Sequence, residues 1–175
     1  KRLREEWMYR KNLFAPVRDK AGRWERMLTI EILPMKKVGA LKPMLMELAD
    51  HHNQVAVNFQ GLYPLLNIDE KIQILQQGIG AGNTVAAILS DGSSWQGFCV
   101  FSHTGGCGSI DYLYIRQALR GQGAGKLLMQ WMLEQLGQLQ LTLLELKVVV
   151  GNEQAVRFYE QYGFAARTVT LAKRI

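Results

Sequence analysis

The sequence predicts an α/β (α+β) domain in which helices pack against a mixed, mostly antiparallel sheet. Three observations support this class. Segments with strand alternation and segments with helical periodicity follow one another along the chain. Short turns alone separate the three central strand segments, which favours an antiparallel meander. The 175 residues, 48% of them apolar and 21% charged, have the length and composition of one globular domain.

The first elements are one strand and two helices. The alternating run LTIEIL predicts a strand over 28–33, ended by the proline that follows. Apolar residues spaced by three and four predict a helix over 38–54, with a start or break near its internal proline. A second helix is expected to begin at Asp69, whose side chain can cap it. We interpret the alternating glycines of 78–84 as a loop that stops this helix.

The middle of the chain predicts the meander. The runs TVAAILS (84–90) and WQGFCVFSH (95–103) are joined by DGSS, whose Asp-Gly pair is typical of a hairpin turn. A third strand is expected over 109–115, SIDYLYI, and it leads directly into a glycine-rich run.

The last third predicts a helix, a strand, a short helix and a final strand. The first helix starts near residue 124, and the run TLLELKVVV predicts the strand that follows it. The short helix is expected over 152–162, because Gly163 stands where a left-handed helix terminus favours glycine. The run AARTVTLAKRI at 165–175 predicts the final strand.

Charge divides the chain into a basic N-terminal extension, 1–27, and a single domain, 28–175. The extension holds nine cations and four acids, which gives +5 of the chain's formal +6. No nucleic-acid motif accompanies these cations, so we expect packing on the domain or on a second subunit, and a homodimer stays open.

Several classes of protein are excluded at this stage. No apolar run reaches the roughly 18 to 20 residues that span a bilayer, so no membrane partner is expected. The first residues do not resemble a signal peptide, and a cytoplasmic location is the expectation. The two cysteines form no CxxC pair and no histidines cluster near them, which predicts neither a disulfide framework nor a metal site.

The run RGQGAGKLL, residues 120–128, is a glycine-rich turn that opens a helix. It is no Walker A loop, because Arg120 stands where that loop needs its first glycine and Leu127 where it needs Ser or Thr. The GxGxxG pattern of dinucleotide sites fails too. The N–H groups of 121–126 and the helix dipole would suit a pyrophosphate, although such a turn is also common as plain structure.

A second motif decides between these alternatives. Asn152 is a good N-cap, and aromatic residues follow it at helical spacing in NEQAVRFYEQYGF. With the R-x-x-G-x-G turn, this segment resembles the GNAT superfamily of acetyl-CoA-dependent N-acetyltransferases, whose two motifs stand here in order over about 109–165. The resemblance implies a sheet of six or seven strands flanked by about four helices, with two splayed strands forming the cofactor cleft.

The resemblance also implies a role for each motif residue, with acetyl-CoA as cosubstrate and no metal. Tyr159 would be the general acid that protonates the departing thiolate, which a phenol with a pKa near 10 can do at neutral pH. Main-chain groups of 113–115 would bind the pantetheine arm of the cofactor, and the N–H groups of 121–126 would hold its pyrophosphate. Asn152 would contact the arm, and Phe158 would line the path of the arm. These cofactor-binding candidates are Leu113, Tyr114, Ile115, Arg120, Gly121, Gln122, Gly123, Ala124, Gly125, Lys126, Asn152, Phe158 and Tyr159.

The general base is not identified by the sequence. Many members of the family carry a glutamate where this chain has Ser109. The nearest carboxylate is Asp111, which is a candidate base through water, a charge partner for a cationic substrate, or simply a solvated residue. His51, His52, His103 and Glu145 are weaker candidates.

The resemblance therefore implies direct acetyl transfer to a primary amine of a small molecule in a ternary complex. Two alternatives stay open: a peptide or protein amine as acceptor, and a regulatory domain that binds acyl-CoA without turnover. The sequence identifies neither the acceptor nor the oligomeric state.

Overall fold

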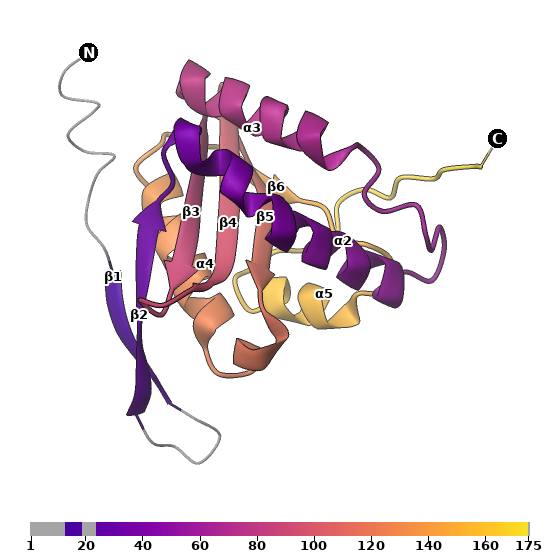
Figure 1. Cartoon of the computed structure of the whole chain (residues 1–175). Helices are drawn as coiled ribbons and strands as arrows, with labels where there is room; N and C mark the ends of the chain where they lie inside the picture. The colour runs from indigo at the N-terminus through magenta and orange to yellow at the C-terminus, as the bar shows by residue number, and fades with distance from the viewer. Residues whose placement is uncertain (1–12, 19–23, 175) are drawn as a thin grey trace.

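The computed structural model describes residues 13–18 and 24–174, which form a six-stranded sheet with helices on both faces (Figure 1). The strands stand in chain order, and every neighbouring pair is antiparallel except the last, β5 and β6, which is parallel. This confirms the predicted fold class. The strands are β1 (Leu13–Arg18), β2 (Trp24–Ile32), β3 (Thr84–Ser90), β4 (Trp95–Thr104), β5 (Cys107–Ile115) and β6 (Leu143–Leu146).

Four α-helices and two short 3₁₀ helices lie within the described residues. Helices α2 and α3 cover one face of the sheet, and α4 covers the other (Figure 1). The helices are η1 (Met35–Leu41), α2 (Lys42–Val55), α3 (Ile68–Ala81), η2 (Gln117–Leu119), α4 (Ala124–Leu136) and α5 (Glu153–Glu160).

The sheet separates two hydrophobic cores, because successive strand side chains point to opposite faces. On β4, Phe98 and Val100 enter the core under α2 and α3, while Cys99 and Phe101 enter the core under α4. Each fully buried side chain of this size contributes roughly 1.5 to 3 kcal/mol to folding. The alternation also decides which side chains of β5 can meet which helices.

The N-terminal strand pair extends the sheet beyond what the sequence predicted. Residues 13–18, part of the predicted extension, form β1, which pairs with β2 from Leu13↔Ile30 to Arg18↔Trp24. Strand β2 therefore begins at residue 24 rather than 28. Strand β2 is longer than predicted because its first residues pair with β1, whereas β3 pairs only with residues 29–32 of β2. The division into 1–27 and 28–175 stays a prediction.

Helix α3 corrects the prediction at both of its ends. The Asn67 side chain, not Asp69, caps it by accepting the Asp69 N–H at 2.8 Å. The helix continues through Gly78 and Gly80 and ends at Ala81, with Gly82 as its C-cap at a φ of +74°. The interpretation of 78–84 as a loop is therefore wrong for 78–81. A glycine inside a helix costs only about 1 kcal/mol, and the packed apolar face of α3 outweighs that cost.

The C-terminal segment differs most from expectation, because residues 165–174 form no strand. The run alternates like a strand, but Val169 and Leu171 are 80% and 91% exposed, so the alternation buries no face. The segment is held instead by an ion pair of Arg167 with Glu145 at 2.8 Å and by a hydrogen bond from Arg174 to the Gln60 carbonyl at 2.7 Å. Strand β6 is also shorter than the predicted run.

Candidate active site

Strand β5 extends beyond its parallel neighbour. Pairing with β6 ends at Ile110, whereas β5 continues to Ile115. The Arg116 N–H donates to the Gln96 carbonyl of β4 at 2.9 Å, so alternate residues of β5 point their main-chain groups toward β4. Leu113 and Ile115 therefore direct theirs to the opposite side, past the end of the ladder with β6. This is the open edge of β5.

A bulge marks the start of the open edge. Tyr112 pairs with Val100 and Ile110 pairs with Phe101, which leaves Asp111 as an extra residue on β5. A bulge bends its strand and increases the local twist. The bend lies directly after Ile110, the last residue of β5 that pairs with β6.

The glycine-rich turn between β5 and α4 presents main-chain donors. Gly121 and Gly123 have φ of +76° and +88°, and a Cβ at either position would have no atom within 4 Å. Gly123 is the N-cap of α4 and makes no side-chain cap, so the N–H groups of 124–126 have no acceptor within the helix. The turn thus offers bare donors to an anion, and the residues fit a pyrophosphate. The Gln122 side chain is engaged with the Ala118 carbonyl at 2.7 Å.

The first turn of α4 connects these donors to the core. Ala124 is fully buried, and Lys126 is exposed. Gly125 faces the ring of Phe158, from which a Cβ would lie 3.7 Å away. An alanine would fit there, so the turn needs its glycines for their positive φ at 121 and 123 rather than for space at 125.

Arg120 ties the turn to β5 and α2. Its Nε donates to the Ile115 carbonyl at 2.9 Å, and its Nη1 lies 3.4 Å from His51 Nδ1. Its guanidinium carbon also lies 5.6 Å from the centroid of the Tyr114 ring. The Arg120 guanidinium therefore contacts other residues of the protein. Its expected part in holding the cofactor stays a prediction.

Helix α5 begins where the motif predicts. The Asn152 side chain caps it by accepting the Ala155 N–H at 3.2 Å. The residue before the cap, Gly151, has a φ of +106°, and a Cβ there would overlap the carbonyl oxygen of Val55 on α2. The start of α5 thus packs closely against the end of α2.

Tyr159 and Phe158 pack on the α4 side of the sheet with Leu113 and Cys99. The Phe158 and Tyr159 rings meet edge to face at 5.3 Å, and Tyr159 meets Phe164 in the same way at 5.8 Å. Burial, with a smaller contribution from the charge of Cys99, raises the pKa of Tyr159 to about 12. The phenol therefore carries its proton at neutral pH. Cys99 pairs with Leu113 across β4 and β5, which places the phenol near the open edge.

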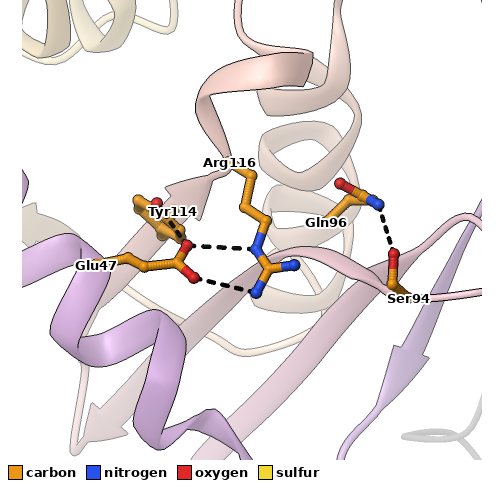
Figure 2. A network of polar contacts seen from close by, with 5 residues as sticks. All are labelled: Glu47, Ser94, Gln96, Tyr114 and Arg116. Atoms are coloured by element: carbon orange, nitrogen blue, oxygen red, sulfur yellow. Dashed lines mark hydrogen bonds and ion pairs between the residues drawn. The ribbon is translucent and has the colours of Figure 1, made fainter.

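On the opposite face, Glu47 of α2 clamps the end of β5 (Figure 2). It accepts the Tyr114 hydroxyl at 3.0 Å and two bonds from Arg116, from Nε at 3.3 Å and from Nη2 at 3.1 Å. Burial, the hydrogen bond to Glu47 and the Glu47 charge raise the pKa of Tyr114 to about 12, so this phenol is neutral too. Sequence reasoning missed Glu47, because no motif marks it and its partners lie far along the chain.

The candidate bases lie apart from one another. Asp111 is exposed and accepts the Ser109 hydroxyl at 2.7 Å, and exposed Glu145 pairs with Arg167. Burial, then the charges of His51 and Lys71, lower the pKa of His52 to about 4. Burial and then Arg120 lower the pKa of His51. Both imidazoles are neutral at pH 7. His103 lies near the end of β4, where it pairs with Gly108 and its N–H donates to the Asn83 carbonyl at 2.9 Å.

Two further findings concern the described residues alone. No group of three His, Cys, Asp or Glu side chains among 13–18 and 24–174 is arranged to hold a metal ion. Within the same ranges, no helix has the length and apolar character needed to cross a membrane. The expectation that no metal takes part stays a prediction.

The described residues thus form a mixed sheet in which β5 continues past β6 and leads into a glycine-rich helix start, with Tyr159 packed on the α4 side of the sheet. The sequence model of the Acetyltransferase (GNAT) family matches residues 46–164. The chain belongs to this family, whose members use acetyl-CoA. No curated protein matches the chain significantly.

Solved structures resemble this fold over most of the chain. A ribosomal-protein-alanine N-acetyltransferase from Brucella melitensis biovar Abortus 2308 is 19% identical, with a TM-score of 0.61 over 85% of this chain and 99% of its own. A transcriptional regulator from Bacillus halodurans C-125 is 21% identical, with a TM-score of 0.65 over the same shares, 85% and 99%. AAC(6′)-Iy, in complex with the bisubstrate analogue CoA-S-monomethyl-acetylneamine, is 13% identical, with a TM-score of 0.62 over 85% and 99%.

Proposed function

We propose that the protein transfers the acetyl group of acetyl-CoA to a primary amine of a small molecule by direct attack in a ternary complex. The observation that carries this proposal is the open edge of β5, which leads along the chain into the glycine-rich turn and whose Leu113 packs in the same core as Tyr159. Acetyl-CoA supplies a thioester, whose carbonyl carbon the amine attacks. The protein must bind the cofactor, stabilise the negative charge that develops on the carbonyl oxygen, protonate the thiolate and accept the proton of the amine.

The open edge and the turn suit the two ends of the cofactor. The main-chain groups of Leu113 and Ile115 would bind the extended pantetheine arm as a neighbouring strand does. An N–H of this edge would also donate to the oxygen of the reacting carbonyl, which gains negative charge as the amine attacks. The donors of 121–126 would bind the pyrophosphate, and Asn152 and Phe158 would border the arm.

The two faces of the sheet suit the two partners of the reaction. Tyr159 lies on the α4 face and holds its proton, so it would protonate the departing thiolate. The amine would then approach from the face of α2 and α3, where Tyr112 and Tyr114 point. It must be neutral to attack, which at pH 7 costs a lysine-like amine roughly 4 to 5 kcal/mol and an α-amine about 1. Asp111 is the proposed base or charge partner, acting through water.

Binding and turnover are tested separately. We expect calorimetry to detect acetyl-CoA binding, and a thiol-release assay to detect turnover with at least one amine among polyamines, amino acids, aminoglycosides and peptides. Turnover with peptides alone would favour a protein acceptor. Binding without turnover across the whole panel would favour a regulatory domain, and absence of acetyl-CoA binding would contradict the proposal.

Gly123→Val should weaken acetyl-CoA binding at least tenfold. A β-branched residue strains the left-handed conformation at φ +88°, and its side chain would stand among the turn's donors. Calorimetry measures the effect. The matched control is Gly92→Val, which has a similar φ of +86° in the turn between β3 and β4. Equal acetyl-CoA affinity in the two variants would exclude the turn as the pyrophosphate site.

Arg120→Lys should weaken acetyl-CoA binding by about tenfold although the charge is kept. Lysine cannot both donate to the Ile115 carbonyl and stack on Tyr114, and a bond from a charged donor is worth roughly 1.5 to 3 kcal/mol. The affinity is measured by calorimetry. Arg157→Lys, at an exposed position of α5, is the control and should bind as the wild type does. Unchanged affinity in Arg120→Lys would show that this bond does not position the turn.

A further inference from the structure

Lys71 of α3 is a half-buried cation whose only described partner is a tyrosine. Its Nζ donates to the Tyr112 hydroxyl at 3.3 Å and lies 5.5 Å from the centroid of that ring. Ion pairs between described residues join Lys42 to Asp69, Arg116 to Glu47 and Arg167 to Glu145. Among residues 13–18 and 24–174, no carboxylate pairs with Lys71. A partly desolvated ammonium of this kind favours an anion beside it.

A chain of side-chain contacts leads from Lys71 to a second cation, Arg120. Lys71 contributes to lowering the pKa of His52, and His52 in turn meets the Tyr63 ring edge to face at 5.4 Å. Beyond His52 lies His51, 6.5 Å away between ring centroids, and His51 is in contact with Arg120. Two cations therefore flank two neutral imidazoles. In the described part of the chain, Arg120 donates to the Ile115 carbonyl and to His51 rather than to a carboxylate.

This group lies beside the open edge of β5, on the acceptor's face. Tyr112 directly precedes Leu113, whose main-chain groups point into the opening. The Tyr112 ring packs in the core under α2 and α3, with Phe98 at 6.1 Å. Tyr159 packs in the core on the other side of the sheet. Lys71 is thus on the side from which the amine would approach.

We propose that Lys71 and the Tyr112 hydroxyl bind an oxyanion of the acceptor, so the acceptor is a small amine that also carries a carboxylate or a phosphate-type group. This inference rests on the proposed function, and it names the substrate class. A cation donating to an oxyanion makes a short, charge-assisted bond, and a phenol can add a second. The same cation disfavours a protonated amine close by, which helps the acceptor to reach its reactive neutral form.

The test compares amines that differ only in the oxyanion. Glycine is paired with methylamine, and β-alanine and 2-aminoethylphosphonate are each paired with ethylamine. In the wild type, at least one anionic amine should have a kcat/KM ten times that of its partner. Comparison of β-alanine with the phosphonate tells which oxyanion is preferred. A wild type that prefers the partner without the oxyanion in every pair would overturn the inference.

Lys71→Gln should remove this preference, chiefly by raising the KM of the anionic amine at least tenfold while the KM of acetyl-CoA stays the same. Lys71→Arg should restore most of it, and Tyr112→Phe should give a smaller loss of about threefold, as expected for one hydrogen bond. Lys36→Gln, at an exposed lysine of η1, is the matched control. Equal preference in Lys71→Gln and Lys36→Gln would refute the role of Lys71.

Binding in the presence of coenzyme A separates this inference from the proposed function. Coenzyme A carries no acetyl group, so calorimetry of each amine with the coenzyme A complex measures recognition without reaction. If the anionic amines bind in a way that depends on Lys71 but no amine is acetylated, acetyl transfer is refuted and the oxyanion site is supported. Turnover without Lys71-dependent binding or preference would support the transfer and refute the site.

Discussion

Tyr159→Phe is expected to lower kcat by roughly 10²- to 10³-fold with little change in acetyl-CoA affinity. The substitution removes the proton donor for the thiolate and keeps the ring that packs against Phe158 and Phe164. General acid catalysis is worth about this much. Stopped-flow or steady-state thiol release measures kcat, and calorimetry measures affinity.

Tyr162→Phe is the matched control, because Tyr162 packs on the same Phe158 ring at 5.3 Å. It should keep kcat within about threefold of the wild type, because the hydroxyl of this half-buried residue has no part in the proposed reaction. Comparable losses in the two variants would point to packing rather than acid catalysis. A kcat of Tyr159→Phe close to the wild-type value would remove Tyr159 from the mechanism.

The pH dependence of kcat gives a second check on Tyr159. Burial raises the pKa of Tyr159 to about 12, so the protonated, active form persists well above neutral pH. The wild type should therefore show no fall in kcat between about pH 7 and pH 10 from this group, whereas an ordinary tyrosine, with a pKa near 10, would be half deprotonated at pH 10. A basic limb below pH 10 that disappears in Tyr159→Phe would contradict this assignment.

Gly151→Ala is expected to cost roughly 3 kcal/mol or more of the free energy of unfolding. Alanine at φ +106° is strained, and its Cβ would overlap the Val55 carbonyl oxygen at the end of α2. Relief would require the loop at 150–151 to move away from α2, which would break the bond from the Val57 N–H to the Val150 carbonyl at 3.0 Å. Chemical denaturation measures the loss.

Gly105→Ala separates strain from overlap, because Gly105 also has a positive φ, +58°, but a Cβ there has no atom within 4 Å. This control should lose only about 1 to 2 kcal/mol. Gly151→Ala should also lower kcat under folding conditions, since α5 and Tyr159 follow directly. Equal stability of Gly151→Ala and Gly105→Ala would show that the end of α2 and the loop at 150–151 move apart at little cost in free energy.

Elements with local determinants could be predicted from the sequence. The hairpin of β3 and β4 follows from an Asp-Gly turn between alternating runs, and the start of α5 follows from Asn152 as a cap. The resemblance of two motifs, R-x-x-G-x-G and NEQAVRFYEQYGF, predicted the family, because each motif is a short run of neighbouring residues. These elements needed no knowledge of distant partners.

The remaining features depend on contacts between distant segments. Local glycine propensity predicted a loop at 78–81, but packing against the sheet keeps α3 helical there. Alternation predicted a strand after Phe164, but strand formation requires a face to bury. The Glu47 clamp and the Lys71–Tyr112 contact join residues 67 and 41 positions apart. No periodicity or motif reports such pairs.

The two outer strands of the sheet bear on how the protein avoids aggregation. An outer strand offers unpaired main-chain groups to other chains, and proline, charge and short length are the usual protections. Strand β1 carries Pro16, which lacks an N–H, and β6 has only four residues, with Glu145 held by Arg167 along it. Both outer strands therefore resist edge-to-edge association. Removal of Pro16 from β1 and of Glu145 from β6 would leave two strands that can pair with other chains.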